Sequence, residues 1–288
     1  MAVATKRESD YYDSKYLADY YATLWTNHPA LKDIDVYWRY FTEQTRSRNR
    51  SSPFVVLDCG TGTGRVLHSL IERAVAEPTM DISAVQFWGL DKSRFMLEQA
   101  KMVDWTPNNI SVSWFLGDAA SLDQLDTLSR PVDLFIFAFS AINHLHKPGE
   151  IDRFFSSLRT LLKPDSLALI SVCTPLLDCT EEHVFNPFGK VKEVRSKFLN
   201  HITYHEREVG QTVEGDLFIN SLETEVWQTN EDGSKLVIES NSHNIPLRLL
   251  TREGLRSCIS KAGLELVGED LTGEEVIFVM KLNKEESG

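Results

Sequence analysis

Three glycines at alternate positions follow an aspartate at the end of an apolar run, and this segment is the part of the chain best suited to bind a ligand. Residues 55–57 are apolar and lead to Asp58, after which Gly60, Gly62 and Gly64 precede a stretch with helical periodicity. Glycine lets the backbone approach a ligand closely, because it lacks a Cβ and tolerates positive φ. The first turn of the helix would offer unpaired N–H groups to a polar ligand. The segment therefore predicts a strand, a tight turn and a helix start around a nucleotide-like ligand.

The spacing of these glycines distinguishes between nucleotide-binding motifs. A dinucleotide-binding G-x-G-x-x-G would need a glycine where Arg65 stands, and a P-loop would need a lysine after Gly64. The D-x-G-x-G-x-G found here resembles motif I of the class I S-adenosylmethionine (SAM) dependent methyltransferases. The resemblance covers roughly residues 53–174 and resumes at about 250–282. It implies a Rossmann-like α/β fold with a doubly wound, mostly parallel seven-stranded sheet, which binds SAM and releases S-adenosylhomocysteine (SAH).

Alternation of apolar runs with helical patterns points to the same fold. Strands are expected at 54–58, 84–90, 110–116, 132–139 and 167–173, and helices at 65–76, 93–103 and 148–162. Such alternation indicates a parallel, doubly wound sheet. A helix capped by Thr251 and two strands at 264–269 and 276–281 would complete the sheet.

Two regions depart from this alternation. Residues 10–47 carry a helical pattern rich in aromatic side chains, which predicts an N-terminal helical cover. Between residues 174 and 246 the pattern changes to long period-two stretches with a hairpin signal at 230–233, which indicates an antiparallel insertion. We expect one domain over residues 1–288, with a helical cover at 10–50, a SAM-binding core at 53–174 and 247–282, and a β-rich cap at 175–246.

Acidic side chains end three of the predicted strands. Asp58 follows the first strand, Asp91 the second and Asp118 the third. Ligands of open α/β sheets bind outside the carboxyl ends of the strands. Carboxylates buried there need partners, and a ligand with hydroxyl and amino groups would supply them. Each acid taken singly could equally cap a helix or lie at the surface.

The resemblance assigns roles to these positions. It implies that Asp91 accepts hydrogen bonds from both ribose hydroxyls, that Asp118 and Ala119 meet the adenine amino group, and that Asp58 orients the ammonium group through water. The glycine turn would leave room for the methionine portion. The complete set expected to bind the cofactor is Asp58, Gly60, Thr61, Gly62, Gly64, Asp91, Lys92, Asp118, Ala119, Phe139 and Tyr20.

The sequence says less about the methyl acceptor. Methyl transfer from a sulfonium needs mainly alignment and exclusion of water. A hydroxyl acceptor would need a base, whereas a neutral amine or a carboxylate would not, and His144 is the candidate catalytic residue. Tyr16, Asn143 and His144 are expected to meet the substrate. Asn143 and His144 could equally cap a loop, and Tyr16, Tyr20 and Trp25 could equally pack a helix onto the sheet.

Composition narrows the possible partners. A net charge of −12 argues against a general affinity for nucleic acid or anionic membranes. No apolar run is long enough to span a membrane, and the polar first residues predict no signal peptide. The cysteines show no C-x-x-C pairing, which favours reduced, buried thiols in a cytoplasmic protein. His183, His201, His205 and His243 are expected mostly at the surface.

Missing motifs narrow the function further. The fourth strand is not followed by the [DNS]-P-P-[YFW] run of amino methyltransferases that act on nucleobases or glutamine. The fifth lacks the Asp-Asn of the metal-dependent catechol type, so no metal is expected. We expect SAM-dependent transfer to nitrogen or oxygen of a small molecule, by a monomer or homodimer. A protein methyltransferase, a catalytically silent methyltransferase-like scaffold and an NAD-dependent oxidoreductase stay open as alternatives.

Overall fold

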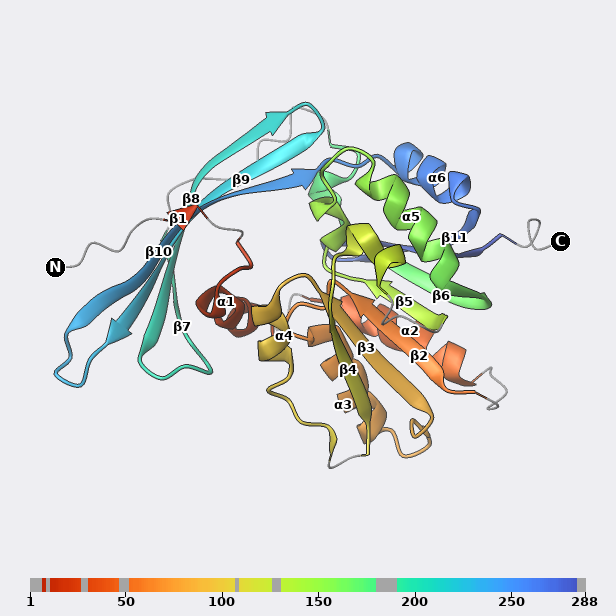
Figure 1. Cartoon of the computed structure of the whole chain (residues 1–288), viewed down its shortest axis with the longest axis horizontal. Helices are drawn as coiled ribbons and strands as arrows, with labels where there is room; N and C mark the ends of the chain where they lie inside the picture. The colour runs from red at the N-terminus through yellow and green to blue at the C-terminus, as the bar shows by residue number, and fades with distance from the viewer. Residues whose placement is uncertain are drawn as a thin grey trace.

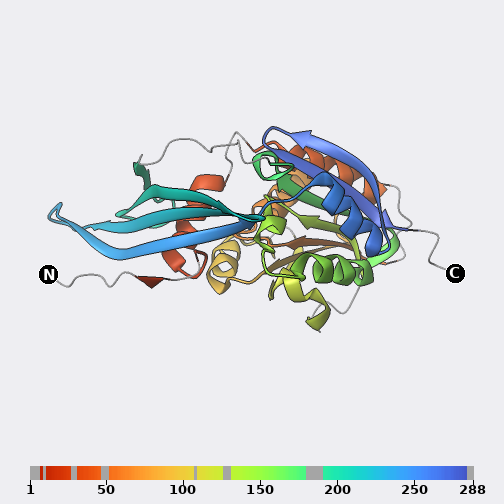
Figure 2. The ribbon, with the colours of Figure 1, turned by 90° about the horizontal axis from the view of Figure 1, so that it is seen from above.

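Two β-sheets lie side by side, a seven-stranded sheet that carries the glycine turn and a five-stranded sheet formed largely by the insertion (Figures 1 and 2). The computed structural model describes residues 7–8, 11–26, 31–46, 52–106, 109–125, 131–179 and 191–283. In both views the smaller sheet projects to the left of the larger one, with the N-terminal helix α1 (Lys15–Trp25) beside it.

The larger sheet has the predicted doubly wound architecture. Its strands are β2 (Phe54–Cys59), β3 (Val85–Asp91), β4 (Ser111–Leu116), β5 (Val132–Phe137), β6 (Leu162–Cys173), β11 (Leu264–Thr272) and β12 (Glu275–Leu282). They lie in the order β11-β12-β6-β5-β2-β3-β4. β4, β3, β2, β5 and β6 are parallel, whereas β12 is antiparallel to both neighbours. From β2 the chain adds β3 and β4 on one side, and it then adds β5 and β6 on the other side of β2. The strand order therefore reverses between β2 and β5, and such folds bind ligands at this point.

Helices cover both faces of this sheet. On one face, α2 (Asp33–Arg46) and α3 (Arg65–Ala76) pack their apolar side chains against the strands. On the other, α5 (Glu150–Leu161) and α6 (Arg252–Lys261) do the same. Every residue of β2 and β5 is buried, as expected for strands covered on both sides. α4 (Arg94–Ala100) lies next to α1 and at the edge formed by β3 and β4.

The insertion after β6 forms the predicted antiparallel sheet. It contains β7 (Val191–Arg195), β8 (Ile202–Glu214), β9 (Leu217–Thr229) and β10 (Lys235–Arg248). The predicted hairpin joins β9 to β10, where the Gly233 N–H donates to the Asn230 carbonyl at 2.9 Å. The short strand β1 (Arg7–Glu8) pairs in parallel with β10. The sequence did not predict β1 or β7, because both are too short to show a periodicity.

The aromatic N-terminal pattern forms two helices that serve different sheets. Tyr20 of α1 packs against Ile202, Tyr204 and Val226 of the smaller sheet. The Asp19 carboxylate, also on α1, accepts the Tyr204 hydroxyl at 2.5 Å. α2 instead covers the larger sheet through the buried Tyr37 and Phe41. The N-terminal cover is therefore divided, and one part anchors the inserted sheet.

An ion pair joins α2 to the helix that follows the glycine turn. Arg65 donates to both carboxylate oxygens of Asp33, at 3.0 and 2.6 Å, and the two side chains are 8% and 1% exposed. Asp33→Ala would leave a buried guanidinium without its partner, so the free energy of unfolding should fall by about 3–5 kcal/mol. Urea unfolding measures this loss. Asp35→Ala, which breaks an exposed pair with Arg73, should cost less than about 1 kcal/mol. Equal losses would contradict the importance of the buried pair.

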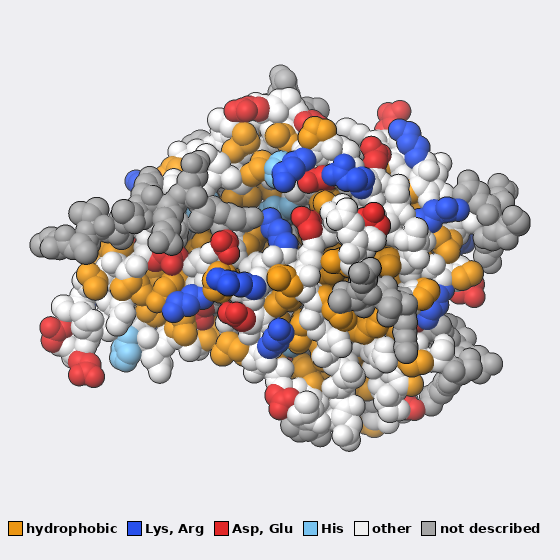
Figure 3. Space-filling model, viewed as in Figure 1, with side chains coloured by type: hydrophobic (Ala, Val, Ile, Leu, Met, Phe, Trp, Pro, Cys, Tyr) orange, Lys and Arg blue, Asp and Glu red, His pale blue; other side chains and the backbone are white. Residues whose placement is uncertain are grey.

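The structure can be compared with three expectations from composition, which concern membrane spans, cysteines and surface charge. No helix among the described residues is long and apolar enough to cross a membrane. The cysteines form no disulfide, but only Cys59 is buried, whereas Cys173, Cys179 and Cys258 are partly exposed. On the face seen in Figure 3, lysine and arginine side chains are interspersed with acidic ones and form no single patch.

Candidate active site

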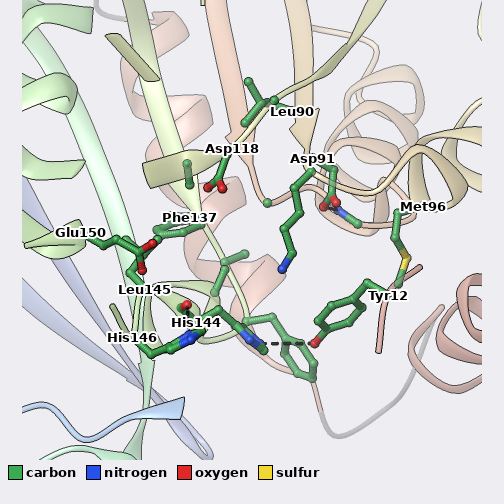
Figure 4. Close-up of a pocket in the computed structure, with 18 of the residues that line it drawn as sticks. Tyr12, Leu90, Asp91, Met96, Asp118, Phe137, His144, Leu145, His146 and Glu150 are labelled. Atoms are coloured by element: carbon green, nitrogen blue, oxygen red, sulfur yellow. Dashed lines mark hydrogen bonds between the residues drawn. The ribbon is translucent and has the colours of Figure 1, made fainter. Parts of the chain in front are cut away.

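A pocket lies at the carboxyl ends of β2, β3, β4 and β5, where the N-terminal segment crosses the edge of the larger sheet. The empty space within its outline is about 950 Å³, which includes the open mouth. Figure 4 shows Asp91 and Asp118 directed into this space, with Tyr12 and His144 across from them. The pocket therefore gathers residues from the N-terminal segment and from four strand ends.

Asp91 is fixed by the backbone around it. Its Oδ2 accepts the Gly62 N–H and its Oδ1 accepts the Ser93 N–H, both at 2.8 Å. Ser93 also begins α4 and donates its hydroxyl to the Tyr12 carbonyl at 2.6 Å. Each carboxylate oxygen has a second lone pair, so Asp91 can accept further hydrogen bonds from ligand hydroxyls. The predicted acid at the end of the second strand thus lines the pocket in a defined orientation.

The three glycines of the turn differ in what they contact. All have positive φ, between 55° and 80°. Gly60 and Gly62 line the pocket. A Cβ on Gly60 would lie 3.0 Å from the ring of Phe137, so the wall is closed by direct contact there. Gly64 does not line the pocket, and a Cβ on it would lie 2.8 Å from the Trp114 ring. The structure thus assigns Gly64 to packing, whereas we had expected it to contact the cofactor.

Asp58 and Thr61 lie behind the turn. Asp58 is 1% exposed, and its Oδ2 accepts the Thr61 hydroxyl at 2.6 Å. Its Oδ1 has no hydrogen-bond partner among the described residues. Burial raises the pKa of the Asp58 carboxyl to about 7, and the hydrogen bond from Thr61 opposes part of that rise. Neither side chain lines the pocket, so Thr61 acts on Asp58 and does not reach a ligand directly.

The raised pKa of Asp58 predicts a pH-dependent stability. The unfolded carboxyl has a pKa near 3.9, so between about pH 4 and 7 only the folded state holds the proton. Rising pH therefore favours unfolding, and the stabilisation present below about pH 4 is lost as pH passes 7. Asp58→Asn removes this dependence. The unfolding free energy of the wild type minus that of the variant should fall by about 2–4 kcal/mol from pH 4 to 8 in urea titrations. A difference that does not change with pH would contradict the buried, protonated carboxyl.

Residues that follow β4, β3 and β5 also line the pocket. Asp118 and Ala119 follow β4 and line it, and Asp118 Oδ1 accepts the Ala120 N–H at 2.9 Å. Lys92, which follows Asp91, lines the pocket with its ammonium 5.9 Å from the centre of the Tyr12 ring. Phe139 follows β5 and also lines it. These positions were all expected to contact the cofactor.

His144 faces Tyr12 across the pocket. The Tyr12 hydroxyl lies 3.3 Å from His144 Nε2, and the two rings meet edge to face with centroids 5.5 Å apart (Figure 4). His144 ends the short 3-10 helix η3 (Ala141–His144), which follows β5. A neutral imidazole can accept a hydrogen bond at one nitrogen while it donates from the other. The pair can therefore hold a proton next to a bound acceptor.

Two tyrosines that we expected at the pocket lie elsewhere. Tyr20 is fully buried, and its ring centre lies 5.1 Å from that of Tyr204 in the smaller sheet. Tyr16 packs against the same cluster. Tyr21 lines the pocket instead. Successive residues of a helix differ by about 100° in direction, so the face of α1 that carries Tyr16 and Tyr20 cannot also carry Tyr21.

Asn143 does not reach the pocket either. It is fully buried, and its Nδ2 donates to the Arg248 carbonyl at 2.7 Å. Arg248 ends β10 and donates its Nε to the Leu145 carbonyl at 3.2 Å. Asn143 is thus the loop-binding residue that we held open as its alternative, and it ties the segment after β5 to the inserted sheet.

Several pocket residues escaped the sequence analysis. Tyr12 and Tyr21 belong to the aromatic pattern that we noticed, but their direction had no local signal. Glu150 starts α5 and lines the pocket while it accepts the Lys147 N–H at 2.9 Å. His243 is 2% exposed and packs against Tyr11, so the expected surface position was wrong for it. The expectation for His183 falls outside the described residues.

The sheet order, the glycine turn between β2 and α3 and the acids at neighbouring strand ends define a class I SAM-dependent methyltransferase. The chain belongs to this family. Residues 56–165 match the methyltransferase domain family. The chain is 55% identical over 287 residues to the N-methyltransferase FrzE from Cladobotryum sp, which covers 98% of this chain and 99% of that protein. The oxidoreductase alternative is therefore wrong.

Solved structures show the same fold. The sugar N-methyltransferase KedS8 from Streptoalloteichus sp has a TM-score of 0.64 at 17% identity and covers 99% of both chains. A SAM-dependent methyltransferase from Clostridium acetobutylicum has a TM-score of 0.61 at 14% identity, over 93% of this chain and 98% of that one. SAM-bound CalS10 from Micromonospora echinaspora, an amino pentose methyltransferase, has a TM-score of 0.59 at 18% identity, over 96% and 99%.

Proposed function

We propose that this methyltransferase transfers the methyl group of SAM to a nitrogen atom of a small molecule. The observation that carries the proposal is the 55% identity to a protein named as an N-methyltransferase, which extends over 98% of the chain and so includes every element around the pocket. The pocket supports it, because acidic residues from two strand ends and His144 from the segment after β5 line the same space.

The residues at the strand ends fit SAM. The buried Asp58 does not line the pocket, so it would orient the ammonium group of SAM through water; its Oδ1 has no hydrogen-bond partner among the described residues. Gly60 and Gly62 leave the turn without side chains where the cofactor backbone would pass. Asp91 would accept the ribose hydroxyls, and Asp118 with Ala119 would meet the adenine. The set of polar groups is therefore complementary to the cofactor along its length.

The residues at the other side of the pocket would serve the acceptor. When bound, SAM supplies a methyl group on a sulfonium, which a nitrogen lone pair can displace in line. Tyr12, Tyr21 and Phe139 line this part and would exclude water. An amine that binds in its protonated form must lose a proton before its lone pair can attack. His144 Nε2 would accept that proton, and the Tyr12 ring packed edge to face on the imidazole would hold it in place.

We also propose that the inserted sheet, residues 191–248, acts as a cap that helps to select the acceptor. Arg248 at the end of β10 contacts the segment that carries His144, and α1 ties the sheet to the core through Asp19. No group of three or more His, Cys, Asp or Glu side chains in the described ranges could hold a metal. We propose in addition that the enzyme needs no metal and acts in the cytoplasm as a monomer or homodimer.

Release of SAH tests this function. The purified enzyme is incubated with SAM and three matched sets of acceptors: aliphatic, aromatic and sugar amines, their hydroxyl analogues, and a lysine-rich peptide. We expect turnover with members of the amine set alone. Turnover with the peptide alone would favour a protein methyltransferase, and turnover with the hydroxyl analogues alone would make oxygen the acceptor.

A further inference from the structure

The segment between β5 and η3 has a backbone conformation that most residues avoid. Phe139 and Ser140 are consecutive, and their φ angles are 51° and 57°. Positive φ is unfavourable for a residue with a Cβ and is unusual for a bulky side chain such as Phe139. Such a conformation persists where the surrounding structure holds it in place, and it clusters at functional sites.

Ser140 donates two hydrogen bonds to residues of two other strands, and a third hydrogen bond joins those two residues. Its N–H donates to Ser171 Oγ at 2.9 Å, and its own hydroxyl donates to Glu275 Oε1 at 3.0 Å. The Ser171 hydroxyl donates to the same Glu275 oxygen at 3.0 Å. Ser171 is fully buried in β6, and Glu275 is the 7%-exposed first residue of β12. One carboxylate oxygen thus closes a ring of hydrogen bonds around the left-handed residue.

This turn decides where two pocket residues lie. Phe139 lines the pocket and packs against Trp25, with ring centres 4.9 Å apart. The Ser140 carbonyl accepts the Asn143 N–H at 2.9 Å and so begins the 3-10 helix that ends at His144. A different φ at Ser140 would redirect this carbonyl and move the helix. The conformation of Ser140 therefore sets the position of the His144 ring.

The surroundings of Glu275 keep its oxygen available in either protonation state. Burial raises the pKa of the Glu275 carboxyl, and the nearby Asp33 carboxylate raises it further. The hydroxyls of Ser171 and Ser140 and the guanidinium of Arg65 oppose this rise. A carboxylate and a neutral carboxylic acid both offer an oxygen that accepts hydrogen bonds. The ring around Ser140 does not depend on one charge state.

We propose that Glu275 is a positioning residue of the active site, which holds the left-handed turn at Ser140 and thereby sets Phe139 and His144 in the pocket. The catalytic meaning of this placement rests on the proposed function, whereas the placement itself can be measured without an acceptor. Glu275 lies 131 residues after His144 in the chain, at the start of a strand on the other side of β6.

The test follows the His144 ring in the enzyme without ligands, by ¹H–¹³C NMR, with its signal assigned through His144→Gln. Calorimetry with SAH gives the second readout. Glu275→Ala should shift the His144 signal and weaken SAH binding, and it should lower the rate of methyl transfer about 10- to 100-fold. Glu275→Gln keeps an oxygen acceptor and should retain the wild-type signal. Glu274→Ala, at the exposed neighbouring position, should change neither readout.

A double variant separates positioning from core packing. Glycine adopts positive φ without an anchor, so Ser140→Gly added to Glu275→Ala should move the His144 signal and the SAH affinity back toward the wild type. An unchanged His144 signal in folded Glu275→Ala would overturn the proposal, and so would a loss that Ser140→Gly does not reduce. If Glu275→Ala does not fold, the double variant Ser140→Ala with Ser171→Ala replaces it, because it removes both hydroxyls that donate to Glu275, and an unchanged signal in that variant overturns the proposal. Failure of every amine to react would count against the proposed function and leave these two readouts intact.

Discussion

Asp91→Ala is expected to weaken the binding of SAM and SAH about 100-fold. The carboxylate lines the pocket, and each oxygen can accept a ligand hydroxyl in addition to the backbone N–H that it already holds. Loss of two hydrogen bonds to a charged group, at about 1.5 kcal/mol each, amounts to about 3 kcal/mol. That energy corresponds to slightly more than two factors of ten in the dissociation constant. Isothermal titration calorimetry measures it directly.

The matched variant Asp91→Asn keeps the size of the side chain and one accepting oxygen. Its loss of affinity should lie near tenfold, since one of the two hydrogen bonds can persist. Urea unfolding of both variants must show that they remain folded, because Asp91 also holds the Gly62 and Ser93 backbone. A folded Asp91→Ala enzyme that binds SAM as tightly as the wild type would show that the cofactor does not use this strand end.

His144→Gln should lower kcat about 100- to 10,000-fold, the range of a general base. His144 lies across the pocket from Asp91 and Asp118, so we expect the affinity for SAM to change far less. Single-turnover rates with the best amine, and calorimetry with SAM, test these two expectations.

Tyr12→Phe is the control for this experiment. It keeps the ring that packs edge to face on His144 and removes the hydroxyl 3.3 Å from Nε2. Its effect on kcat should be about tenfold, because the imidazole loses a hydrogen bond and keeps its place in the pocket. A His144→Gln enzyme with a rate close to that of the wild type would contradict a role as a base and would leave His144 as a loop cap.

The features that the sequence predicted well are encoded by neighbouring residues. The strand, the glycine turn and the helix start at 54–76 form one continuous segment, and the structure has all three at those positions. Asp91 and Asp118 line the pocket because they lie at the ends of predicted strands, and the position of each strand in the sheet fixes the position of the residue at its end. Local spacing is therefore enough to place the residues at the strand ends of a doubly wound sheet.

The errors arose where long-range packing decides. Whether Tyr20 or Tyr21 lines the pocket depends on which face of α1 packs against the smaller sheet. Aromatic residues are so frequent in this helix that the sequence does not show which face that is. Tyr12 reaches His144 across 132 residues of chain because the N-terminal segment folds over the sheet edge. No sequence motif surrounds Glu275. Its contact with Ser140 exists only because β12, which begins at Glu275, pairs with β6.

The most direct test of the account is to identify the atom that receives the methyl group. The enzyme is supplied with SAM labelled with ¹³C in its methyl group and with the best amine of the panel, and the product is examined by ¹³C–¹H correlation NMR. The account predicts an N-methyl signal with the wild type and almost none with Asp91→Ala at the same concentration of SAM. A label on oxygen, sulfur or carbon, or no label on any small molecule while SAM binds at this pocket, would contradict it.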